Sequence, residues 1–189
     1  MKKKIPALVL AALLLTGCRG GESSAPRVIP EGITLHTDED VSSEYAETVK
    51  AYFAAVEQND FEAYAGMVHP VYLSAFRTYL EEQKDSSPEE NFARQHKRFD
   101  EDGYDSWRIT DITLSVYQEP DYDYYFKQFT DAGILTEEQV KTVRDSAEEI
   151  QDLKFSIDVL YEGDAEPVTV FRNQQMILFK TADGIRIFG

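Results

Sequence analysis

The sequence predicts an α+β fold, in which helices come first and an antiparallel sheet follows at the carboxyl end. Three observations support this class. Apolar residues recur at spacings of three and four from residue 45 to residue 99. From Trp107 onward the apolar period changes to two, which is typical of strands. Close to the carboxyl end, Asp183-Gly184 is a strong signal for a two-residue hairpin turn.

The first helix is expected at residues 44–58. Ser42 or Ser43 stands just before it and is placed to cap its amino end. Its apolar face consists of Tyr45, Val49, Tyr52, Phe53 and Val56.

A second and a third helix follow directly. Asn59 with Glu62 predicts a capping box at the start of the second helix. His69 precedes a proline and is therefore excluded from helical conformation, so it ends the second helix, and Pro70 begins the third. The expected buried face of the second helix is Phe61, Tyr64, Ala65 and Val68, and that of the third is Leu73, Phe76 and Leu80.

The fourth helix has the clearest start in the chain. Ser87 supplies the cap, Pro88 stands at the first helical position, and Glu90 completes a capping box. The helix carries Phe92, His96 and Phe99 and ends at Asp102-Gly103.

The sheet is expected in the second half of the chain. Ile112, Leu114 and Val116 alternate with polar residues and predict its first strand. Residues 121–150 return to helical spacing, with Thr136 and Gln139 as a helix start. The remaining strands are expected at 153–161, at 168–180 with a bulge near 172–174, and at 185–188.

Charge limits the partners of this chain. The sequence has 35 Asp and Glu against 19 Lys and Arg, a net charge of −16. Such a surface repels nucleic acid and anionic lipid headgroups, so we expect no nucleic-acid partner. We interpret the acidic clusters mainly as a source of solubility, with cation binding as a minor alternative.

The amino terminus has the layout of a secretory signal, with basic residues at Lys2–Lys4 and a short apolar run at 5–15. The run is too short to span a bilayer as a mature helix. Leu15-Thr16-Gly17-Cys18 resembles the lipobox of bacterial lipoprotein precursors. The resemblance implies cleavage before Cys18 and acylation of its thiol, which would anchor the chain in a membrane. The alternative is an ordinary signal peptide followed by a spare cysteine.

We therefore expect three segments: a lipoprotein signal peptide at 1–17, a lipidated cysteine with a flexible tether at 18–43, and one domain at 44–189. The tether interpretation rests on the Gly, Ser and Pro content after Arg19. Removal of the three amino-terminal lysines makes the mature chain more acidic still. The expected location is the extracytoplasmic side of the cell membrane, or an outer membrane if the cell has one.

Residues 44–189 are similar to the NTF2-like superfamily, which includes cystatin-like and SnoaL-type domains. The residues that carry the likeness are Tyr52-Phe53, Asn59-Asp60-Phe61, His69-Pro70 and the closing hairpin 179–187. The resemblance implies a strongly curved antiparallel sheet that forms a cone with the helices, and it makes 121–150 a helical insertion. Such a cone can hold a small molecule, and some members use an Asp, Glu or His in it as a general base. No catalytic position of the superfamily maps onto this chain.

Chemistry-bearing residues are few. His69 is the best candidate for proton transfer because its ordinary pKa is close to neutrality, and Tyr52 and Arg172 are its candidate partners in a pocket. The simpler interpretation is that His69 caps the second helix. The sequence contains no Gly-x-Ser-x-Gly motif, no phosphate-binding glycine loop and no zinc spacing, and we expect no metal and no cofactor.

Two clusters allow more than one interpretation. Asp100, Asp102 and Asp105 could hold a calcium ion, but they lack the EF-hand spacing and a solvated turn is preferred. The tyrosines of the segment 122–125, next to Asp121 and Asp123, could bind a glycan or a partner protein. Equally, they could dock the inserted helix onto the sheet, and we prefer this interpretation.

The expected function is a lipid-anchored extracytoplasmic module that binds a small molecule or an envelope protein without catalysis. The alternative is a small isomerase or hydrolyase with a pocket inside the cone. A cone filled by Phe53, Phe155 and Ile157 would argue against the enzyme. A structural accessory of envelope assembly is a third possibility.

Overall fold

The computed structural model describes residues 32–104, 106–118 and 121–188. The helices are α1 (Ser43–Gln58), α2 (Phe61–Met67), α3 (Pro70–Lys84), α4 (Pro88–His96), α5 (Tyr122–Asp131) and α6 (Glu137–Ser146), with a 3-10 turn at Lys97–Phe99. The strands are β1 (Thr34–Thr37), β2 (Trp107–Val116), β3 (Glu149–Tyr161), β4 (Val168–Thr181) and β5 (Gly184–Phe188). The predicted α+β class, with early helices on a curved sheet and a helical insertion, is confirmed.

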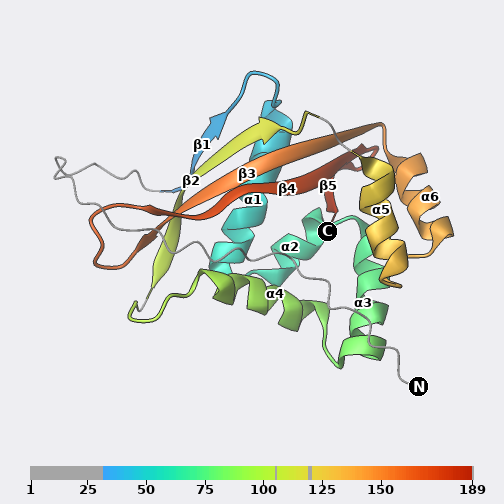
Figure 1. The fold of residues 1–189 in the computed structure, drawn as a ribbon, viewed down its shortest axis with the longest axis horizontal. Coiled ribbons are helices and arrows are strands. Elements are labelled where there is room, and N and C mark those ends of the chain that lie inside the picture. Colours follow the sequence, from blue (N-terminus) through green and yellow to red (C-terminus); the bar gives the residue numbers. More distant parts are fainter. Residues whose placement is uncertain (1–31, 105, 119–120, 189) are drawn as a thin grey trace.

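The five strands form one sheet in the order β1-β2-β3-β4-β5 (Figure 1). The three pairs from β2 to β5 are antiparallel, as predicted, but β1 pairs with β2 in parallel. The sheet is therefore mixed and not wholly antiparallel. β1 lies inside the segment 18–43 that we assigned to a tether, and the neighbouring Ile33 and Val41 are buried in the core. Four residues are too few to show a strand period, so the sequence pattern missed this strand.

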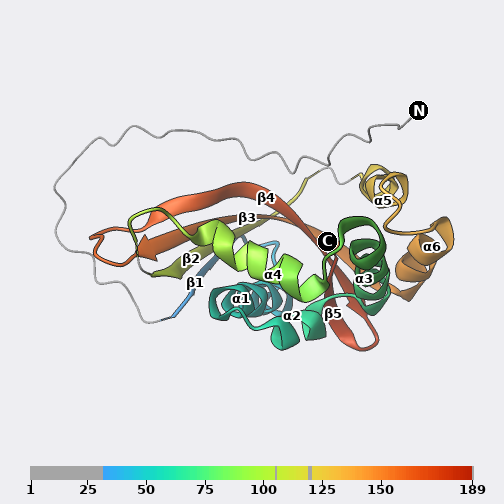
Figure 2. The ribbon, with the colours of Figure 1, turned by 90° about the horizontal axis from the view of Figure 1, so that it is seen from below.

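The sheet arches over α1 and α4, and α5 and α6 lie at the end of the sheet where β3 begins (Figure 2). All five residues predicted for the apolar face of α1 are buried. They pack against the side of the sheet that carries Ile112, Leu114, Leu153 and Ile157, each with no exposed surface. This packing of α1 on the sheet stabilises the fold, because burial of apolar area is the dominant favourable contribution to folding.

The junctions between helices explain how α2 and α3 are placed. Asn59 is in the left-handed conformation at the end of α1, and Asp60 caps α2 by accepting a hydrogen bond from the Ala63 amide at 3.0 Å. The cap is therefore one residue later than predicted, and the predicted capping box is wrong, because Ala63 at the third helical position has no side-chain acceptor. His69 and Pro70 start α3 as expected. The buried face of α3 is Tyr72, Ala75 and Leu80, while Leu73 and Phe76 are half-buried.

The sheet ends largely as the sequence indicates. The bulge predicted near 172–174 is confirmed, because β4 has one more residue than β3 between the paired positions Phe155 with Gln174 and Ile157 with Phe171. The closing turn is displaced by one residue from the prediction: Ala182 and Asp183 form it, and Gly184 opens β5 with φ at +104°. Ile150, which we grouped with the inserted helix, belongs to β3.

Both capping boxes predicted from Ser87 and Thr136 are present, with reciprocal bonds to Glu90 and Gln139. Ser42 stands at the cap position of α1, but its side chain makes no capping bond. Among the described residues, every helix is too short or too polar to cross a bilayer. Cys18 and the signal segment lie outside the described residues.

Candidate functional site

The three residues of the predicted pocket make their contacts in separate parts of the fold. Tyr52, in α1, is buried, and its hydroxyl donates to the Gln95 side chain at 2.9 Å. Its ring packs against Phe53 and Tyr64. Arg172 is exposed at the bulge of β4. None of these contacts of Tyr52 or Arg172 involves His69.

His69 lies between α3, β5 and the end of α6, and only 3% of it is exposed. Its amide donates to the Ile187 carbonyl, and its ring stands edge-on to Phe179 and Phe188. The Ser146 hydroxyl donates to the Val143 carbonyl at 2.7 Å, so its oxygen accepts from His69 Nε2, 3.1 Å away. This leaves His69 Nδ1 as the unprotonated nitrogen, buried and without a partner in the described part of the chain.

This burial makes the protein sensitive to acid. Desolvation, helped by the Arg186 guanidinium, lowers the pKa of His69 below the usual 6.5. The unfolded chain therefore binds the proton more readily, and His69 reduces stability as pH falls below about 6.5.

We expect His69→Gln, which keeps a donor for Ser146 but does not titrate, to flatten the loss of unfolding free energy between pH 7 and pH 5. Urea denaturation across this range measures it. Above pH 7 the unfolding free energies of the wild type and of His69→Gln should change with pH to the same extent. If the two free energies also fell in parallel from pH 7 to pH 5, His69 would not contribute to the acid sensitivity.

The space between α1 and the sheet is filled by aromatic side chains. The ring centroids of Phe53, from α1, and Phe155, from β3, are 5.1 Å apart, and Tyr52 stands edge-on to Phe53 at 4.9 Å. Between α2 and α4, Tyr64 packs on Phe92 at 4.5 Å. Phe53 is buried, and Ile157 in β3 has no exposed surface. These are the residues that the sequence analysis named as the ones that would close the cone.

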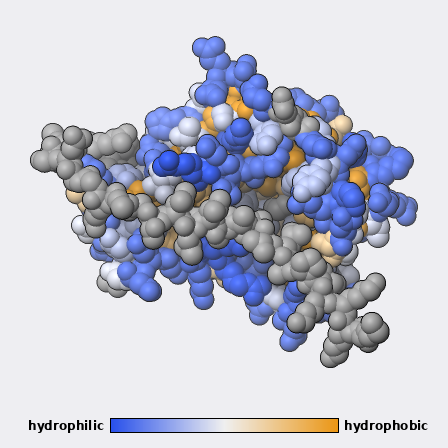
Figure 3. All heavy atoms as spheres, in the orientation of Figure 1, coloured by the Kyte–Doolittle hydropathy of each residue, from blue (hydrophilic) through white to orange (hydrophobic). Residues whose placement is uncertain are grey.

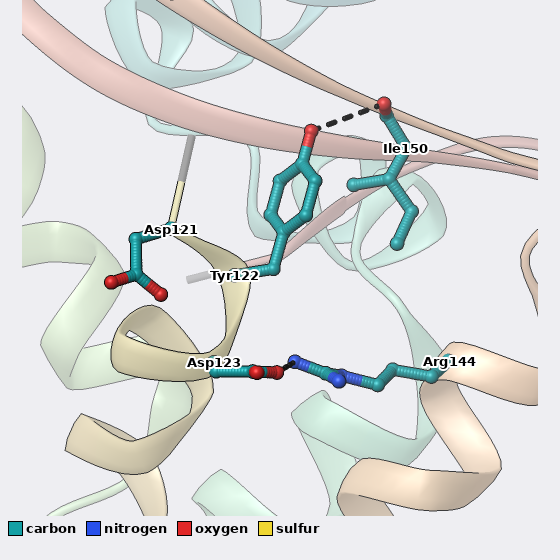
Figure 4. Close-up of a pocket in the computed structure, with 5 residues that line it drawn as sticks. All are labelled: Asp121, Tyr122, Asp123, Arg144 and Ile150. Carbon is teal, nitrogen blue, oxygen red and sulfur yellow. Dashed lines mark hydrogen bonds and ion pairs between the residues drawn. The ribbon is translucent and has the colours of Figure 1, made fainter. Parts of the chain in front are cut away.

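A hollow of about 420 Å³ lies instead at the outer end of the sheet, between α5, α6 and the start of β3 (Figure 4). Its lining residues are Asp121, Tyr122, Asp123, Arg144 and Ile150. Figure 4 shows the Tyr122 ring and the Ile150 side chain on one side and the Asp123 and Arg144 pair on the other. The hollow therefore has an apolar wall and a charged wall.

The sequence builds this hollow through two helix ends. Asp121 caps α5 by accepting from the Tyr124 amide at 2.9 Å, which places Tyr122 and Asp123 in the first turn. The Tyr122 hydroxyl donates to the Ile150 carbonyl at 3.3 Å and ties α5 to β3. Arg144 comes from the last turn of α6, where a cation is favoured by the helix dipole.

Arg144 is held on two sides. Its guanidinium donates to Asp123 Oδ1 at 2.6 Å and stacks over the Phe126 ring at 4.8 Å. Its Nε atom is buried and has no partner among the described residues. The ion pair is largely exposed on the Asp123 side, so it contributes little to stability.

A buried carboxylate lies next to the hollow. Asp152 follows Ile150 on the same face of β3 and is 3% exposed. One carboxylate oxygen accepts from the Gln175 amide at 2.6 Å, while the other, Oδ1, has no partner among the described residues. Burial raises the pKa of Asp152, and burial together with the Asp152 charge raises the pKa of Tyr122.

The other cluster shows no sign of an ion site. Asp100 accepts from the Trp107 indole at 3.0 Å, Asp102 is exposed in a turn, and Asp105 lies outside the described residues. Within the described ranges, His, Cys, Asp and Glu form no group of three or more that could hold a metal ion.

Sequence reasoning noticed Asp121, Tyr122 and Asp123 but missed Arg144 and Asp152. Both missed residues depend on how α5 and α6 fold back over β3. Because side chains alternate along β3, Asp152 and Leu153 lie on opposite faces of the sheet. The face with Asp152 would be solvated if no helix covered it. The sequence did hold one signal for Asp152: it stands near the start of a strand that directly follows a helical insertion, and such an insertion can cover that strand.

Comparison with known proteins adds little. No family model matches the chain, and no curated protein matches it in sequence. One similar solved structure is that of a candidate dehydratase from the NTF2-like family of Streptomyces avermitilis. The two chains share 12% identity, and the match covers 76% of this chain and 88% of the other, with a TM-score of 0.35. No residue role passes from that protein to this one.

Proposed function

We propose that this chain is a lipid-anchored extracytoplasmic module that binds a ligand or a partner protein without catalysis. The observation that carries the binding role is the packing of the fold. Aromatic rings occupy the space between α1 and the sheet, while the charged hollow lies outside that space. A catalytic pocket inside the cone would need His69, Tyr52 and Arg172 to converge, and their contacts lie apart.

The location rests on the sequence. The basic start, the short apolar run and Cys18 after Gly17 support cleavage and acylation. The described surface is mostly hydrophilic on the face seen in Figure 3. With a net charge of −16 the protein repels anionic headgroups, so acyl chains must supply its membrane attachment.

The test of the anchor is the mass of the mature protein after expression in a bacterium that processes lipoproteins. The wild type is expected to lack residues 1–17 and to carry the mass of two or three acyl chains on its amino-terminal Cys18. Cys18→Ala is expected to lose the acyl mass. Gly17→Ala, which keeps a small residue before the cysteine, is the matched control and should still be acylated. An unmodified Cys18 in the wild type would overturn the anchor.

A further inference from the structure

We propose that the hollow between α5, α6 and β3 binds an organic cation, namely an ammonium or guanidinium group on an apolar stem. This inference rests on the binding role proposed above and names the class of ligand. The free cation and a lysine or arginine side chain of a polypeptide share this chemistry, and the experiment below separates them.

The apolar wall suits the stem of such a ligand. The Tyr122 hydroxyl is already engaged with the Ile150 carbonyl, so its ring is held in place and presents apolar area to the hollow. Ile150 extends this wall. Contact with these two side chains would remove the stem of the ligand from water, which is favourable in proportion to the apolar area buried.

The polar wall suits a cationic head. Asp121 uses Oδ1 to cap α5, and Asp123 uses Oδ1 to hold Arg144, so the second oxygen of each carboxylate can still accept from a ligand. The Asp123 side chain is 88% exposed and can be reached. A charge-assisted bond from an ammonium or guanidinium to a carboxylate is stronger than a neutral one.

The hollow already holds one guanidinium in this manner. Arg144 lies between a carboxylate, Asp123, and an aromatic face, Phe126. A second cation in the hollow, between the Asp123 carboxylate and the Tyr122 ring that faces it (Figure 4), would find the same two kinds of contact.

The charge balance favours a cation over an anion. Asp123 neutralises Arg144, which leaves Asp121 uncompensated within the lining. Asp152, whose Oδ1 has no partner within the described ranges, adds an acidic group beside Tyr122. An anion entering the hollow would have to displace Asp123 from Arg144 against this field.

Tyr124 can distinguish the two sources of the cation, a free ligand and a polypeptide side chain, because it is 64% exposed in the first turn of α5. A free cation that fills the hollow does not need this ring. A polypeptide whose basic side chain enters the hollow keeps its backbone outside, where it can also contact exposed side chains of the same helical turn, such as Tyr124.

The test is an amide NMR titration of the full chain in micelles with n-butylammonium, n-butanol and n-butyrate. We expect n-butylammonium to shift the amides of Tyr122, Asp123, Arg144 and Ile150 in a saturable way, and n-butanol to bind at least about tenfold more weakly. The peptide acetyl-Ala-Lys-Ala-amide is the second arm. Tighter binding with an added shift at Tyr124 assigns the site to a polypeptide, and equal binding assigns it to a free cation.

Variants sharpen the result. Asp123→Asn removes one acceptor and frees Arg144, so affinity for n-butylammonium should fall about tenfold or more while n-butyrate begins to bind. Asp131→Asn is the matched control, because Asp131 is in the same helix and pairs with Lys127, away from the hollow. This variant should bind n-butylammonium as the wild type does.

Preference of the wild type for n-butyrate, shifts located elsewhere, or no saturable shift with n-butylammonium would each overturn the proposal. Any of these results leaves the membrane anchor standing, because the acyl mass on Cys18 is measured independently. Shifts elsewhere would still support a binding role, at another surface.

Discussion

Replacement of Phe126 by alanine is expected to lower the free energy of unfolding by about 3–5 kcal/mol. Phe126 is the only residue of α5 that is fully buried. Its ring packs against the rings of Phe179 and Phe188, with centroid distances of 6.0 Å and 5.3 Å. It also carries Arg144 on its face. The variant loses the apolar contact area, leaves a cavity under α5, and removes one of the two contacts that hold Arg144. Urea denaturation at pH 7 measures the loss.

Tyr124→Ala is the matched control for this prediction. It removes a ring of similar size from the same helix, but the ring is mostly exposed. Its cost should stay within about 0.5 kcal/mol. If Phe126→Ala cost as little as Tyr124→Ala, α5 would not be packed on the sheet, and the hollow it borders would have no fixed shape.

The second large effect is expected for Phe53→Ala, again about 3–5 kcal/mol. Phe53 lies on the buried face of α1, and its ring packs against Phe155 and Tyr52. Because residues of both α1 and the sheet surround the ring, neither side can close the gap without moving a whole element. The variant should therefore keep a cavity lined by apolar side chains, which stays dry.

Glu47→Ala, on the exposed side of α1, is the control and should change stability by less than about 0.5 kcal/mol. The two variants together separate the buried face of α1 from its solvated face. A small loss for Phe53→Ala would mean that the interior is loosely filled, and a ligand cavity under the sheet would again be plausible.

Local signals predicted much of this fold. The face of α1, the capping boxes at Ser87 and Thr136, and the bulge in β4 follow from residue types at short spacing, so one sequence is enough to find them. β1 was missed because its place in the sheet depends on pairing with β2, far along the chain. The sequence analysis did not place Tyr72 on the buried face of α3 for a similar reason. The Tyr72 ring is buried by contact with Phe129 and Phe188, and both lie more than fifty residues away in the sequence.

The candidate site was less predictable than the fold. Its acidic and aromatic residues stand together in the sequence, but Arg144 and Ile150 reach them only after α6 folds back onto β3. His69 was chosen for its ordinary pKa, a property that its burial then changes. Neither long-range packing nor burial can be obtained from spacing alone.

If aromatic side chains close the space under the sheet, a ligand must bind at the outer hollow. Crystals of the wild type and of Phe53→Ala under xenon pressure can decide this, because xenon enters apolar cavities that are empty. We expect no xenon between α1 and the sheet in the wild type, and a bound xenon atom beside Phe155 in Phe53→Ala. Xenon next to Phe53 in the wild type would show that the space under the sheet is open.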